Sequence, residues 1–205
     1  MSGFGRAARL VGACAPGARV DTTRAPRREL TLRSLDDLLA DVSAIAAAAR
    51  DEAEAGVTPG ARVGERLWVS GNWSAGQILQ HVAIVMEKSL TGFAYQAPIS
   101  IRAVGRAARV VAMSRPTPAG IRWPDDGGEF TPDAQVWTEA GADRLERVVR
   151  RVRAGERMTA KNPVLGELSH EDWVRVHLRH AELHLSFVHV GNERTVPGHA
   201  ASLAI

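Results

Sequence analysis

Histidine is concentrated in one stretch of the sequence, and imidazole is the side chain best suited to bind transition metals near neutral pH. Five of the chain's seven histidines lie between residues 169 and 190. His180 and His184 are four residues apart, which in a helix separates them by about 40° around the axis and roughly 6 Å along it. Two imidazoles at that spacing can bind one ion, as in the helical H-x-x-x-H of zinc enzymes. The spacing therefore predicts that His180 and His184 are two of the ligands of a metal site.

The segment H-A-E-L-H differs from that of the helical zinc proteases, in which a glutamate directly follows the first histidine. Glu182 falls on the polar face of the expected helix, so this is not a site of that class. His177, one turn before the pair, lies on the same apolar arc. It is a candidate ligand in place of His180, or a group that contacts the ligands without binding the metal.

A third ligand must come from another helix, and His81 borders the apolar stripe of an earlier one. Three neutral histidines leave one position of a tetrahedral metal open for water or substrate, as in catalytic sites. Gln77, one turn before His81, is a candidate to orient a ligand, although it also has a capping role. The alternative is a metal-free cluster of core histidines that hydrogen-bond across the helices.

Capping signals fix the register of the helices that would carry these histidines. Three pairs have the S-x-x-D or S-x-x-Q spacing of a capping box, namely Ser34 with Asp37, Ser74 with Gln77, and Ser169 with Asp172. They predict helices over 34–55, 74–93 and 169–190. Apolar periodicity predicts two more helices, over 98–115 and 138–155. In the 98–115 helix, which is rich in arginine, we expect the arginines to face solvent and the valines to face inward.

The chain has no marked alternating pattern of the kind that predicts strands. We therefore predict an all-α fold: an antiparallel four-helix bundle with an extra short helix and a long irregular connection over 116–134. We expect this domain to span 29–191, between a disordered basic tail over 1–28 and a C-terminal tail over 192–205. A translation start upstream of the true one would also account for 1–28, and an organellar transit peptide is the less favoured alternative.

The positive charge of the chain is unevenly distributed. The formal net charge is +3, but residues 1–28 hold six arginines and one acidic residue, which leaves −2 for the rest. A domain with this balance is not expected to bind nucleic acid. The single cysteine, Cys14, excludes an internal disulfide and suits a cytoplasmic location. The sequence contains no apolar run near the roughly 20 residues of a membrane span.

Two segments resemble the bacterial family called domain of unknown function 1569, in the DinB-like superfamily of four-helix bundles. They are GNWSAGQILQHVA (71–83) and NPVLGELSHEDWVRVHLRHAELHLSF (162–187), and the resemblance covers about 29–190. In the superfamily, a histidine of the second helix and an H-x-x-x-H of the last one bind a divalent metal. The resemblance implies these roles for His81, His180 and His184. Asn162 departs from the pattern, because relatives often have histidine there.

Other branches of the superfamily include metal-dependent thiol transferases and a mycothiol-dependent isomerase. The resemblance therefore implies a metal-dependent transferase or hydrolase that acts on a small molecule, with a low-molecular-weight thiol as a candidate co-substrate and zinc, nickel or iron as the metal. The first alternative is a non-catalytic binding module with a structural histidine cluster. The second is a peripheral membrane or nucleic-acid binder that uses the arginine tail and the 99–113 helix. A homodimer remains open.

Overall fold

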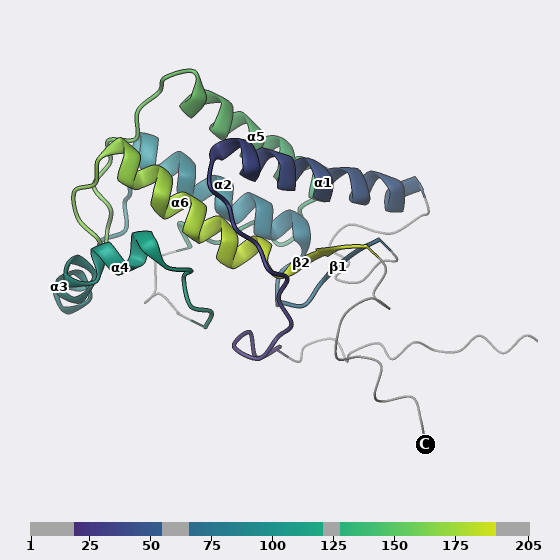
Figure 1. The fold of residues 1–205 in the computed structure, drawn as a ribbon, viewed down its shortest axis with the longest axis horizontal. Coiled ribbons are helices and arrows are strands. Elements are labelled where there is room, and N and C mark those ends of the chain that lie inside the picture. The colour runs from purple at the N-terminus through teal and green to yellow at the C-terminus, as the bar shows by residue number, and fades with distance from the viewer. Residues whose placement is uncertain (1–18, 55–65, 121–127, 192–205) are drawn as a thin grey trace, which may run out of the picture.

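The computed structural model describes residues 19–54, 66–120 and 128–191, and this part of the chain is mostly helical. Figure 1 shows its elements, which in chain order are α1 (Leu35–Glu54), β1 (Leu67–Val69), α2 (Ala75–Thr91), α3 (Ile99–Ala107), α4 (Arg109–Ser114), α5 (Thr138–Arg153), α6 (His170–Leu185) and β2 (Val188–Val190). The predicted dominance of helix is confirmed. None of the described helices is long and apolar enough to cross a membrane.

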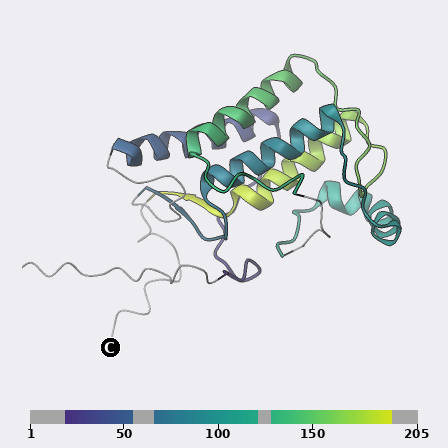
Figure 2. The same cartoon turned by 180° about the vertical axis from the view of Figure 1, so that it is seen from behind.

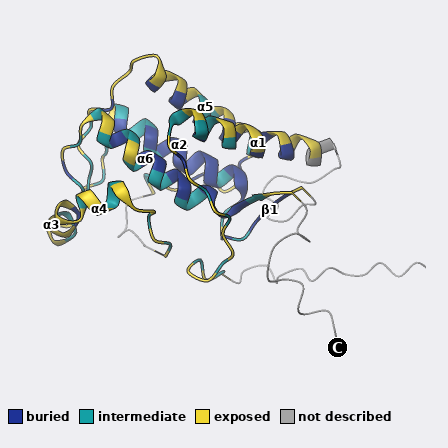
Figure 3. Ribbon diagram, viewed as in Figure 1, coloured by how far each residue is buried: buried dark blue, intermediate teal, exposed yellow. Residues whose placement is uncertain are grey.

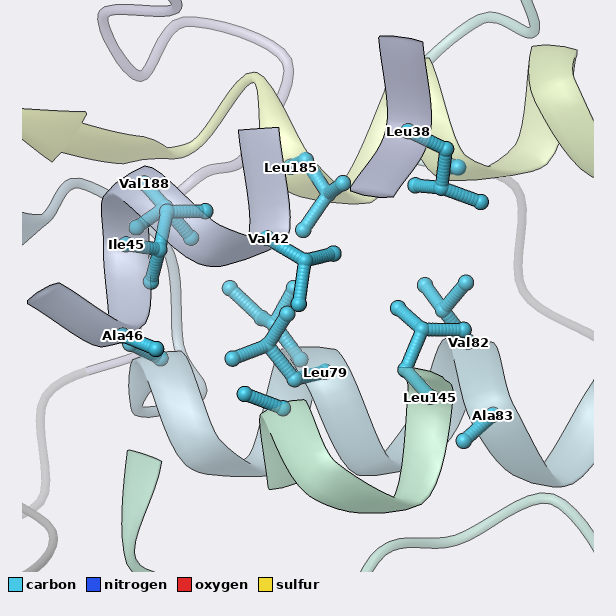
Figure 4. Close-up of a cluster of buried hydrophobic side chains, with 14 of the residues drawn as sticks. Leu38, Val42, Ile45, Ala46, Leu79, Val82, Ala83, Leu145, Leu185 and Val188 are labelled. Carbon is cyan, nitrogen blue, oxygen red and sulfur yellow. The ribbon is translucent and has the colours of Figure 1, made fainter. Parts of the chain in front are cut away.

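The four long helices enclose the main core. α2 contacts both α5 and α6, and α1 contacts the same two helices from the other side (Figures 1 and 2). Figure 4 shows leucine and valine side chains from all four helices meeting between them, among them Leu38, Leu79, Val82, Leu145 and Leu185. Each of these side chains is fully shielded from solvent. Burying one such side chain contributes roughly 1.5–3 kcal/mol, so this contact holds α2 and α6 in a fixed register.

Glycine allows α2 and α5 to approach each other closely. A Cβ atom built on Gly141 would lie 2.5 Å from the carbonyl oxygen of Gly76 and 3.0 Å from the Cβ of Leu79. Carbon and oxygen atoms cannot approach so closely without repulsion, so only a residue without a side chain fits between the two backbones.

The predicted capping boxes of α1 and α2 are confirmed. Ser34 Oγ accepts a hydrogen bond from the Asp37 backbone N–H at 3.1 Å, and the Asp37 carboxylate accepts one from the Ser34 N–H at 3.0 Å. Ser74 and Gln77 make the same reciprocal pair at the start of α2. Each pair satisfies backbone donors that a helix end would otherwise leave unpaired, and so fixes where the helix begins.

The last helix begins as predicted but ends earlier. Ser169 caps α6, which stops at Leu185 and not at Gly191, and the chain continues as β2. β2 pairs antiparallel with β1, where no strand was predicted, in the register Trp68↔His189. The pairing buries Val188 completely and stacks the His189 ring on Trp68 at 3.7 Å. A three-residue strand is too short for its alternation to stand out in the sequence, which is why the pair was missed.

The predicted helix over 98–115 is two helices, α3 and α4, which meet at Ala108. Their orientation is the reverse of the prediction, because Val104 and Val111 are exposed. The inward contact of α3 is Gly105, where an added Cβ would lie 2.8 Å from the carbonyl oxygen of Val164. The reversal has a local cause: a glycine permits this close contact, and the apolar side chains are left on the opposite face.

Residues before α1 form an extended segment that packs on the helices. We expected the tail to run through residue 28, but Arg28 donates to the backbone carbonyl oxygen of Val188 at 2.6 Å and forms a two-bond ion pair with Asp41. The Leu32 N–H donates to the buried carboxylate of Glu182 at 2.7 Å. Arg28, the last residue of the expected tail, is thus tied to α1 and β2. Residues 1–18 and the expected C-terminal tail lie outside the described residues.

Candidate metal centre

The packing of α2 against α6 brings His81 to His180 and His184. One potential ligand atom from each of the three rings lies within 4.8 Å of the others. The Nε2 atoms of His81 and His180 are 3.2 Å apart. The ring centroid of His184 lies 4.5 Å from that of His81 and 4.6 Å from that of His180. The rings therefore converge from two helices on one point.

The distance between the His81 and His180 nitrogens fits a shared cation. Two imidazole nitrogens bound to one zinc ion at about 2.0–2.1 Å stand roughly 3.3 Å apart when the coordination is tetrahedral. The 3.2 Å between Nε2 of His81 and Nε2 of His180 is close to that value, although it also suits an N–H···N hydrogen bond. A hydrogen bond would join only two of the rings, whereas a cation would use His184 as well.

A hydrogen bond to the backbone fixes the orientation of the His81 ring. Its Nδ1 lies 2.7 Å from the backbone carbonyl oxygen of Phe130. A carbonyl oxygen can only accept, so Nδ1 carries the proton and, in the neutral ring, Nε2 carries the lone pair. Metal binding through Nε2 requires this tautomer. A backbone carbonyl that accepts from the other ring nitrogen is a common feature of metal-binding histidines.

The Phe130 carbonyl is held in place by side chains of α2. Gln80 forms two hydrogen bonds with Asp133, from its amide to the carboxylate and from the Asp133 N–H to its Oε1, both at 2.7 Å. The Gln77 side-chain amide donates to the Asp133 carbonyl oxygen at 3.1 Å, and its Oε1 accepts a hydrogen bond from the Ser74 N–H. Gln77 therefore anchors the connection that carries Phe130, and its contacts are to backbone groups, not to the imidazoles. Sequence reasoning missed Gln80, because nothing local marks a glutamine that bonds 53 residues away.

Burial keeps the imidazoles neutral. His81 is 7% exposed, and His180 and His184 are half-buried. Burial lowers the pKa of both His180 and His184 well below the usual value, and the positive charge that His81 would carry lowers them further. Neutral imidazole is the form that binds metals. Both α6 histidines are therefore ready to act as ligands at neutral pH.

A family described as "Protein of unknown function (DUF1569)" matches residues 25–190. The chain belongs to the DUF1569 family. The match runs from before α1 to the end of β2, so it includes all three histidines and begins near Arg28, where the segment that packs on the helices begins to contact them. No curated protein and no solved structure matches the chain.

A tryptophan ring packs against the histidine cluster of this DUF1569 protein. The Trp73 ring centroid lies 4.8 Å from that of His81, and the ring stacks on His184 at 5.9 Å. Trp73 is not among the candidate site residues predicted from the sequence. Its contact with two of the three imidazoles gives it a role at the site: it shields one side of the cluster from water.

His177 lies in the core next to the cluster and not among its converging nitrogens. Its Nε2 lies 3.0 Å from Ser89 Oγ, and because Ser89 donates to the Met86 carbonyl oxygen, the histidine is the donor in this pair. Its ring stacks on Trp173, and burial lowers its pKa to about 3. These contacts describe a neutral histidine of the core, one turn away from the cluster.

Proposed function

We propose that this DUF1569 protein is a metal-dependent enzyme in which His81, His180 and His184 hold one divalent cation, with zinc, nickel and iron as the candidates. The observation that carries the proposal is the convergence of three ligand atoms within 4.8 Å from two helices. The donor set is appropriate, since imidazole nitrogen suits each of these metals. The number of ligands is appropriate too, because three protein ligands leave a position for a reacting group.

The chemistry we propose is transfer to, or hydrolysis of, a small molecule, with a low-molecular-weight thiol as candidate co-substrate. When bound, the cation would supply a Lewis acid that polarises a carbonyl or lowers the pKa of a water or thiol. The protein's own part is to hold the His81 tautomer through Phe130 and to exclude water with Trp73. His180 and His184 are half-buried, and we propose that a small molecule would approach the cluster on their side.

We further propose that α1, α2, α5 and α6 form an antiparallel bundle of the DinB-like type. The support is the packing of these four helices around one core, with histidines on the second and last of them. The resemblance of 71–83 and 162–187 to DinB-like sequences points the same way. Fold likeness alone carries no activity, so the enzyme proposal rests on the histidine cluster.

A second candidate function is a non-catalytic binding module. The observation that favours it is the 3.2 Å between Nε2 of His81 and Nε2 of His180, which also fits a hydrogen bond in a structural cluster. Under this proposal the imidazoles link α2 to α6, and no metal is required for folding or binding.

Metal analysis of tag-free protein separates the two. The enzyme proposal predicts about one divalent ion per chain for the wild type and loss of that ion in His81→Ala and His184→Ala. His189→Ala is the control, because that ring stacks on Trp68 away from the cluster and should leave the metal content unchanged. A wild type without stoichiometric metal, or a metal that survives His184→Ala, would overturn the metal site. Metal-loaded protein that accelerates neither thiol transfer to a small electrophile nor ester hydrolysis would favour the binding module.

A further inference from the structure

α3 and α4 carry an apolar face that points away from the rest of the protein. Its residues, here called the α3–α4 apolar surface, are Ile99, Ala103, Val104, Ala107, Val110 and Val111. Ile99 is 78% exposed, Val104 69%, Val110 71% and Val111 54%. Figure 3 shows both helices as largely exposed at the margin of the molecule. Four large apolar side chains this exposed on two adjacent helices indicate an interaction site.

The orientation of the surface is determined by contacts on the opposite side of the two helices. Gly105 faces inward against Val164, on the side of α3 opposite Ala103 and Ala107. On α4, Arg109 pairs with Asp172 of α6 at 2.7 Å. These two contacts fix the rotation of the helices about their axes. The valines therefore cannot turn inward without breaking an ion pair and separating a close backbone contact.

The chain segment that carries the surface is positively charged. Residues 98–120 contain four arginines and no acidic residue. Arg109 is compensated by Asp172, whereas Arg106 and Arg115 are exposed. An exposed apolar face flanked by arginine is the pattern of a helix that lies in the interface of a membrane.

We propose that the α3–α4 apolar surface docks on an anionic lipid bilayer. The valines and Ile99 would enter the boundary between head groups and acyl chains, and Arg106 and Arg115 would contact lipid phosphates. A second copy of the chain fits the surface less well. A two-fold contact would place the same arginines opposite one another, and the segment offers no acidic residue to separate them.

Vesicle co-sedimentation of the full chain tests this, with phosphatidylcholine vesicles that contain or lack phosphatidylglycerol. We expect binding only to the anionic vesicles, weakened by added salt. Arg106→Glu should lower the partition coefficient by roughly tenfold, because each arginine near an anionic surface contributes several-fold and the substitution reverses the charge. The matched control is Arg147→Glu, an exposed arginine of α5. Its binding should stay near that of the wild type.

The apolar contribution is tested by replacing Val104 and Val111 together with serine, which changes no charge and leaves the core untouched. This double variant should lose most of its binding, whereas Val190→Ser on β2 should lose none. Equal binding to neutral and anionic vesicles, or none to either, would overturn the proposal. So would binding that is lost on deleting residues 1–18 but kept in the valine variant. A concentration-dependent dimer in light scattering, abolished by the valine substitutions, would assign the surface to a second copy instead.

Discussion

The Nδ1 atom of His81 lies 2.7 Å from the backbone carbonyl oxygen of Phe130, and this contact fixes which ring nitrogen faces the α6 histidines. It couples the cluster to the connection between α4 and α5, which Gln80 and Asp133 hold against α2. The geometry of the cluster therefore depends on residues that do not touch it, as is usual for metal-binding histidines.

Replacing Asp133 should weaken metal binding without removing a ligand. Asp133→Ala breaks the side-chain bond to Gln80 and loosens the Phe130 carbonyl behind His81. Loss of such a supporting group typically costs about 10–100-fold in metal affinity. A competition titration with a chromogenic chelator measures the change, and Asp143→Ala, an exposed carboxylate of α5, is the control. Equal affinities for wild type and Asp133→Ala would show that the connection does not position His81.

Acid should destabilise the metal-free protein partly through His177. In the unfolded chain this histidine binds a proton near pH 6.5, but in the folded state its pKa is about 3. The unfolded state therefore binds more protons between these values, and the free energy of unfolding falls as the pH falls, by at most roughly 1.4 kcal/mol per unit for this group.

His177→Gln cannot be protonated at that position and should show a shallower loss of stability. Urea titrations of the metal-free wild type and variant at pH 7 and pH 5 measure the difference between the two slopes. Parallel losses in the two proteins would mean that His177 is not buried in its neutral form. The acid sensitivity of His180 and His184 is common to both proteins and cancels in the comparison.

Gly141→Ala should be among the more destabilising single-methyl additions in this chain. The new Cβ would lie 2.5 Å from the Gly76 carbonyl oxygen, and α2 and α5 would have to move apart. Overpacking of this kind costs roughly 1–3 kcal/mol. Thermal denaturation followed by circular dichroism measures it, with exposed Ala140→Ser as the control on the same helix. An unchanged melting temperature would indicate that the helices are farther apart in solution.

The segment before α1 should contribute to stability through Arg28. Arg28→Ala removes the paired hydrogen bonds to Asp41 and the bond to the Val188 carbonyl oxygen. A hydrogen bond to a charged group contributes about 1.5–3 kcal/mol net, and the partial exposure of Arg28 to solvent lowers the sum of the three. We expect a net loss of about 2 kcal/mol in urea denaturation. Arg24→Ala, whose side chain is 89% exposed, should be nearly neutral. Similar small effects of both substitutions would place the segment outside the cooperative fold.

The histidine trio was predictable because three local signals coincide. The capping residues Ser74 and Ser169 fix the phases of α2 and α6, and the phase of each helix turns its histidines towards the core. The H-x-x-x-H spacing points to His180 and His184 but leaves His177 as an alternative to His180, and it is the resemblance to the DinB-like superfamily that favours His180. His81 was the natural third ligand because it borders the core stripe of a second helix.

The features that could not be predicted depend on contacts distant in sequence. The Phe130 carbonyl is a backbone atom, and no residue type marks it as the partner of His81. The β1–β2 pair joins Trp68 to His189, and most of the sequence lies between these two residues. The rotation of α3 is set by the fit of Gly105 against Val164, whereas apolar periodicity alone favours the opposite rotation.

Anomalous diffraction from crystals of metal-loaded protein shows whether His81, His180 and His184 share one cation. We predict a single strong anomalous peak for a metal ion that is bound by one nitrogen of each imidazole, with metal–nitrogen distances of about 2.0–2.1 Å if the metal is zinc. The Nδ1 of His81 should still be within hydrogen-bond distance of the Phe130 carbonyl oxygen. A peak at His170 or His189, or loaded crystals in which the three imidazoles contact one another with no peak between them, would mean that the three histidines do not hold a shared metal.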